Sequence, residues 1–170
     1  PNSEKIEEAT FLGAKSAYML SPVYTKDQKE TREAIEKLQV FINTYPNSEY
    51  LEEANKLVKE LDFKLEQKAF SIAKQYNHVS DYKAAIKSFD NFILNFPGSS
   101  LREDALFYRL DSAYRLAINS VETKKETRLQ TAKSYYGNFN KAFKDSKYTD
   151  DVNLMISEIE EELKKYSTNS

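Results

Sequence analysis

The fold of this chain is decided by a stretch that occurs twice, as AIEKLQVFINTYPNS at residues 34–48 and as AIKSFDNFILNFPGS at residues 85–99. In the second copy, Ile86, Phe89 and Ile93 stand three or four positions apart, which is the period of an α-helix. Pro46 and Pro97 follow an aromatic residue at the end of each copy, and a proline there ends a helix because it has no N–H and clashes with the preceding turn. The stretch therefore predicts an amphipathic helix followed by a turn, repeated along the chain.

The repeat extends beyond these two copies. Each turn is followed by an acidic pair and an alanine, and a weaker third copy runs over residues 132–152. At the start of the chain, Pro1-Asn2-Ser3-Glu4 repeats Pro46-Asn47-Ser48-Glu49. Because the chain opens inside a turn of the repeat, we expect the natural protein to continue upstream and this chain to be a C-terminal fragment. Helix pairs that repeat in this way bury their apolar faces by stacking on their neighbours in a solenoid.

Composition excludes many kinds of site. The 170 residues include 25 Lys and Arg against 27 Asp and Glu, a formal net charge of −2, which gives no reason to expect nucleic acid or an anionic membrane surface as the partner. The absence of cysteine excludes disulfides and thiolate sites, and three scattered glycines exclude a glycine-rich phosphate loop. No apolar run approaches the length of a membrane-spanning helix. We therefore predict a protein that is not an enzyme and that needs no cofactor or metal.

Few glycines and prolines and the helical period predict an all-α fold. Helices are expected at residues 4–20, 28–45, 49–77, 81–96, 100–119, 123–143 and 148–166. The third of these has no internal helix breaker. It is either one long helix or two helices with a shallow bend near Phe63 and Lys64.

Residues 66–99 resemble a tetratricopeptide repeat. The pattern is carried by Ala69, Ile72, Ala73, Tyr76, Asp81-Tyr82, Ala85, Phe89, Phe92 and Pro97. Ser80 stands where that family has a turn glycine, and Phe92 where it has alanine. The resemblance implies an α-solenoid of about seven antiparallel helices, one of them long. Residues 1–170 are then one domain, with a partial repeat and first helix pair at 1–48, the long helix and best repeat at 49–99, and a C-terminal repeat and capping helix at 100–170.

The order of motifs is also similar to the BamD (YfiO) family of outer-membrane assembly lipoproteins. It is carried by Ser21-Pro22-Val23-Tyr24, the first repeat copy, Lys68-Ala69-Phe70, Asp81-Tyr82 and Ala113-Tyr114, over most of the chain. The resemblance implies a scaffold of the β-barrel assembly machine at the periplasmic face of the outer membrane. Its implied partners are the POTRA domain of the barrel subunit BamA, other assembly lipoproteins and unfolded outer membrane proteins. The lipid-bearing cysteine of that family is absent here and the substrate-facing repeats are partly missing, so we expect subunit docking rather than substrate capture.

Each candidate site has an alternative structural interpretation. The acidic pairs Glu7-Glu8, Glu52-Glu53, Glu103-Asp104 and Asp150-Asp151 could supply acid–base or metal chemistry. They recur in the first turn of a helix, where negative charge complements the helix dipole, and we favour that interpretation. His78 has no second histidine or cysteine as a partner and is expected to be an exposed turn residue.

The 22 Tyr and Phe residues include the expected core residues Tyr76, Phe89, Phe92 and Tyr114. By resemblance, a tetratricopeptide groove would expose a different set on its inner helices, and these are the candidate protein-binding residues: Gln67, Phe70, Lys74, Asn77, His78, Tyr108, Ser112 and Arg115.

The last two predicted helices carry opposite charge. Residues 122–147 hold seven Lys and Arg and three Asp and Glu, a net +4, whereas residues 148–170 hold two and six, a net −4. We favour mutual attraction within one antiparallel pair over a docking surface for a charged partner.

Two other functions remain open from the sequence. One is a different repeat adaptor that binds peptides or partner proteins. The other is a helical hydrolase that uses the carboxylates, which requires acidic side chains from different repeats to converge in one pocket.

Overall fold

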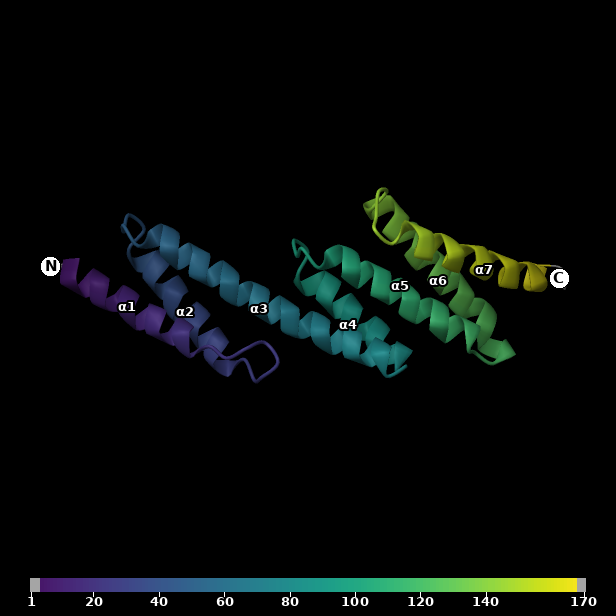
Figure 1. Cartoon of the computed structure of the whole chain (residues 1–170), viewed down its shortest axis with the longest axis horizontal. Helices are drawn as coiled ribbons and strands as arrows, with labels where there is room; N and C mark the ends of the chain where they lie inside the picture. Colours follow the sequence, from purple (N-terminus) through teal and green to yellow (C-terminus); the bar gives the residue numbers. More distant parts are fainter. Residues whose placement is uncertain (1–3, 168–170) are drawn as a thin grey trace. The chain divides into compact units, whose positions relative to one another are not determined.

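The computed structural model describes residues 4–167, so the repeat copy at Pro1-Asn2-Ser3 lies outside the described residues. Within them the chain is all-α and forms seven helices, labelled in Figure 1: α1 (Glu4–Leu20), α2 (Lys29–Thr44), α3 (Leu51–His78), α4 (Tyr82–Asn95), α5 (Arg102–Ile118), α6 (Glu122–Ala142) and α7 (Thr149–Ser167). Every predicted helix is confirmed, with ends that differ by two residues at most. The 28-residue α3 settles the open question of a bend in favour of one long helix. The fold is that of tetratricopeptide-like helical hairpins, as the resemblance implied.

The described chain divides into two compact units, one ending at Lys68 and the other beginning at Ala69. The core of the first unit joins α1, α2 and the first half of α3, with Phe11, Leu38, Phe41 and Leu61 fully buried. The second unit has three buried clusters, in which α5 is the central helix because nine of its residues are buried.

The turn after the repeated stretch has the same geometry at each copy. Tyr45, Phe96 and Phe143 cap α2, α4 and α6, and each donates its N–H to the carbonyl four residues earlier at 2.9 Å. Two residues after the proline position, a serine hydroxyl accepts the N–H two residues further on, at 3.0 to 3.1 Å. The shared Ser48, Ser99 and Ser146 are therefore turn residues that satisfy backbone donors before the next helix begins.

The turn between α3 and α4 contains Ser80, which stands where tetratricopeptide repeats have a glycine. Ser80 adopts a φ of 63°, the left-handed conformation that glycine takes without steric cost. The N–H of Asp81 donates to the carbonyl of Tyr76 at 2.9 Å, and the Asp81 carboxylate accepts the N–H of Ala84 at 3.2 Å. Serine thus adopts here the backbone conformation that favours glycine, and Asp81 is the N-cap of α4.

The long loop between α1 and α2 is ordered by a buried side chain. Gln28 is 1% exposed, and its amide donates to the carbonyls of Val23 and Lys26 at 2.9 and 3.0 Å. From α3, Lys64 reaches the Ser21 hydroxyl at 2.7 Å and Lys68 the Lys26 carbonyl at 2.8 Å. The bonds from Gln28 and Lys68 satisfy backbone carbonyls of the loop, and the bond from Lys64 holds the Ser21 side chain.

The expected core is confirmed for Phe89 and Phe92 and is wrong for Tyr76. Both phenylalanines are buried at 1% exposure or less, whereas Tyr76 is 38% exposed. Ile72, one turn before Tyr76 on α3, is also exposed at 45%, whereas Ala69, Phe70 and Ala73 of the same helix pack into the core. Tyr114 is half-buried and packs at the edge of its cluster.

Candidate protein-binding site

Seven of the eight predicted binding residues lie on the C-terminal part of α3 and on α5, within the second unit. The exception is Gln67, a half-buried residue that belongs to the first unit. The period of the two helices places Phe70, Lys74 and Asn77 on one side of α3 and Tyr108, Ser112 and Arg115 on one side of α5. These two sides face each other, so most of the predicted residues are brought together.

Aromatic contacts form the floor of this surface. The ring of Phe70 lies 5.8 to 6.2 Å from the rings of Phe89, Phe92 and Tyr108 in edge-on arrangements. Above it, the ammonium of Lys74 lies 4.9 Å from the centre of the Tyr108 ring, at cation–π distance. Phe70 therefore serves mainly as packing, whereas Lys74 is exposed and held in a defined position.

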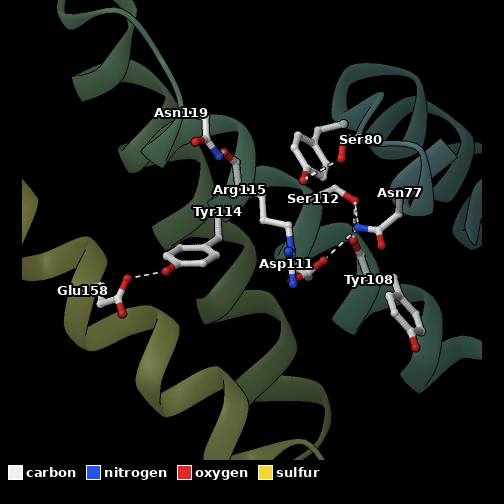
Figure 2. Close-up of polar contacts among 10 residues, drawn as sticks. Asn77, Ser80, Tyr108, Asp111, Ser112, Tyr114, Arg115, Asn119 and Glu158 are labelled. Carbon is white, nitrogen blue, oxygen red and sulfur yellow. Dashed lines mark hydrogen bonds and ion pairs between the residues drawn. The ribbon is translucent and has the colours of Figure 1, made fainter.

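A polar network lies one turn further along both helices. Figure 2 shows Asn77 pointing toward Asp111 and Ser112, and the Asn77 amide donates to them at 2.8 and 3.0 Å. On the other side of Asp111, the Arg115 guanidinium donates to the carboxylate at 2.7 Å. The Ser112 hydroxyl in turn donates to the Tyr108 carbonyl at 2.6 Å. The network ties the end of α3 to the middle of α5.

The electrostatics of this network are those of a satisfied ion pair. Asp111 is 4% exposed and both of its oxygens are engaged, one by Arg115 and one by Asn77. The hydrogen bond to Asp111 and the charge of its carboxylate raise the pKa of Arg115, which favours the charged guanidinium. Ser112 is fully buried and its hydroxyl is occupied, so Asp111 and Ser112 do not form a base and nucleophile pair.

The exposed members are those that a partner could touch. Lys74 and His78 are exposed, the Arg115 side chain is 53% exposed, and Tyr108 and Asn77 are half-buried. His78 was predicted to lie in the turn, and it is instead the last residue of α3. Its predicted exposure is confirmed. The surface is polar and cationic at its rim and aromatic beneath.

Sequence reasoning missed Asp111, which organises the polar network. The available signal was its place four residues before Arg115 on a predicted helix, a spacing that brings opposite charges together. The charge and spacing of Asp111 in the sequence do not predict that Asn77 of another helix donates a hydrogen bond to it.

The acidic pairs are confirmed as residues of helix first turns. Glu52-Glu53, Glu103-Asp104 and Asp150-Asp151 begin α3, α5 and α7, and Glu7-Glu8 lie near the start of α1. Three of these carboxylates also hold neighbouring elements. Glu53 pairs with Lys15 at 2.7 Å, Glu103 accepts the Ser146 hydroxyl at 2.6 Å, and Asp104 accepts the Tyr148 hydroxyl at 2.7 Å. Within the described part of the chain, His, Asp and Glu form no group of three that could hold a metal ion.

The opposite charges of α6 and α7 meet each other, as the favoured interpretation predicts. Lys125 pairs with Glu162 at 2.6 Å and Lys133 with Glu160 at 2.9 Å. The hydrogen bonds and charges of these lysines lower the pKa of both glutamates. The charge asymmetry therefore contributes to the packing of one antiparallel helix pair.

A second surface feature lies in the first unit, where an open groove runs between α1 and α2. It is lined by Ala9, Thr10, Gly13, Ala14, Glu36, Lys37 and Val40. Along α1, Ile6, Leu12, Met19 and Leu20 are large apolar side chains that are each about half exposed or more.

None of the helices between residues 4 and 167 combines the length and the apolar character needed to span a membrane.

Comparison with known proteins assigns the chain to a family. A family model described as YfiO, outer membrane lipoprotein, matches residues 1–129 and again residues 81–169. The two matches overlap, as a repeated structure allows, and together they cover nearly all of the chain. The chain, with its repeated hairpins and turns, is therefore a member of the YfiO family of outer membrane lipoproteins, the family of BamD.

Proposed function

We propose that this chain is a non-catalytic scaffold of the outer-membrane β-barrel assembly machinery, acting on the periplasmic side of the membrane. The observation that carries the proposal is the family match over residues 1–129 and 81–169. A role related to that machinery follows from the family, and the partner and the surface that meets it are the proposed parts.

The proposed partner is the POTRA region of the barrel subunit, with other assembly lipoproteins and unfolded outer membrane proteins as further partners. The proposed contact surface consists of Lys74, Asn77, His78, Tyr108 and Arg115, which are exposed or half-buried; Phe70 is also half-buried but packs beneath them. Two features support this surface. The cation–π contact fixes Lys74 and the Asp111 pair fixes Arg115, so both side chains lose little rotamer freedom when a partner binds.

The absence of an activated group at this surface supports a binding role over a catalytic one. Ser112 is buried, and both carboxylate oxygens of Asp111 already accept hydrogen bonds, one from Asn77 and one from Arg115. The carboxylates that could have served a hydrolase are instead distributed over the first turns of separate helices.

The test is binding of the purified chain to a purified POTRA region, measured by calorimetry. We expect Lys74→Glu and His78→Glu each to weaken binding about tenfold or more, equivalent to about 1.4 kcal/mol. Lys124→Glu is the matched control, because Lys124 is an exposed lysine on α6, a helix that contributes none of the proposed contact residues.

The outcomes separate the partner from the surface. If the unaltered chain does not bind the POTRA region, docking to that partner is wrong, and binding of an extended peptide unrelated to outer membrane proteins would favour a different adaptor role. If the chain binds and all three variants bind equally well, the partner stands and the proposed surface is wrong.

A further inference from the structure

We draw no further inference here: the strongest candidate, the apolar face of α1 beside the groove at Gly13, with Ile6, Leu12, Met19 and Leu20 exposed along it, is an unpartnered helix face, and nothing in the structure shows what covers it.

Discussion

Two three-helix segments of the molecule are built on one plan. The first segment comprises α1, α2 and residues 51–66 of α3, and the second comprises α5, α6 and α7. Phe11 stacks on Tyr50 with ring centres 4.7 Å apart, and the equivalent Phe107 stacks on Tyr148 at 3.7 Å. Each segment thus joins its first helix to the turn before its third helix by the same aromatic pair.

A tyrosine–carboxylate hydrogen bond recurs in the same way. The Tyr18 hydroxyl donates to Glu60 at 2.6 Å and links α1 to α3. The Tyr114 hydroxyl donates to Glu158 and links α5 to α7, as Figure 2 shows. Burial and the carboxylate raise the pKa of Tyr114 to about 12, and the hydrogen bond to Glu60 raises the pKa of Tyr18.

The two segments differ at the seam between their first two helices. Gly13 in α1 leaves an open groove, whereas the equivalent Arg109 in α5 lies 4.1 Å over the Tyr135 ring and pairs with Asp90 of α4 at 2.9 Å. The repeat therefore preserves the contacts between the first and third helices of each segment. The residue between the first and second helices differs, being Gly13 in one segment and Arg109 in the other.

Removing either aromatic stack should cause the largest loss of stability, and the loss should be similar in the two segments. Phe11→Ala and Phe107→Ala should each lower the free energy of unfolding by about 3–5 kcal/mol, because each removes a buried ring and leaves a cavity. Urea titration followed by circular dichroism measures both. Leu154→Ala is the control, since Leu154 is 68% exposed and its loss should change stability by no more than about 0.5 kcal/mol. A large cost at one phenylalanine with a negligible cost at the other would break the equivalence of the segments.

The seam should show a smaller effect that is confined to the second segment. Asp90→Ala leaves the guanidinium of Arg109, whose side chain is only 10% exposed, without its carboxylate partner, and should cost about 1–3 kcal/mol. Arg109→Met should cost less, because the Nε of Arg109 is already buried without a hydrogen-bond partner. The comparison uses unfolding free energies at one salt concentration. Equal costs for the two variants would show that the ion pair itself, and not the orphaned charge, carries the effect.

The tyrosine hydrogen bonds should contribute less and should depend on pH. Tyr114→Phe and Tyr18→Phe should each cost about 0.5–1.5 kcal/mol at neutral pH. The folded-state pKa of Tyr114 is about 12 and its ordinary value is 10, so the folded protein keeps a proton that the unfolded chain releases. This stabilisation is therefore complete below pH 10 and is lost as pH rises toward 12.

The check is a series of unfolding measurements between pH 9 and pH 11.5 on the unaltered chain and Tyr114→Phe. The stability difference between them should shrink as pH rises. If the stability difference between the two proteins stays constant over that range, the hydrogen bond of the Tyr114 phenol is not its source.

The smallest expected effect is a gain at the helical glycines. Gly13 lies in α1 and Gly137 in α6, and a Cβ added at either meets no atom within 4 Å. Gly13→Ala and Gly137→Ala should each raise stability by about 0.5–1 kcal/mol, because alanine has less backbone entropy to lose in a helix. Thermal unfolding measures the gain. A loss at Gly13 alone would show that the groove in the first segment is less open than its geometry indicates.

Local features were predictable from the sequence because they depend on residues close together in the chain. The proline after Tyr45 and after Phe96 stops the preceding helix from continuing, and the acidic pairs lie in the first turn of the next helix. Ser80 was singled out by its departure from the glycine pattern, and its positive φ is the conformation that the pattern required.

The candidate site was predictable only in part. The resemblance to a tetratricopeptide groove placed Lys74 and Arg115 on inner helix faces, and it also placed Ser112 there, which is fully buried. Tyr76 was expected in the core and is exposed, because a repeat position specifies a helix face but not whether another helix covers it. Asp111 was overlooked, since its importance comes from Asn77, 34 residues away in sequence.

The sequence by itself determined that this protein is all-α, where each helix begins and ends to within two residues, and that its hairpins repeat, because period, proline and turn residues act over a few positions. Only the tertiary structure decided which polar side chains are engaged and which remain available. The engagement of Asp111 by Arg115 and Asn77, and the open seam at Gly13 against the filled one at Arg109, depend on distances between helices, and no local rule encodes those distances.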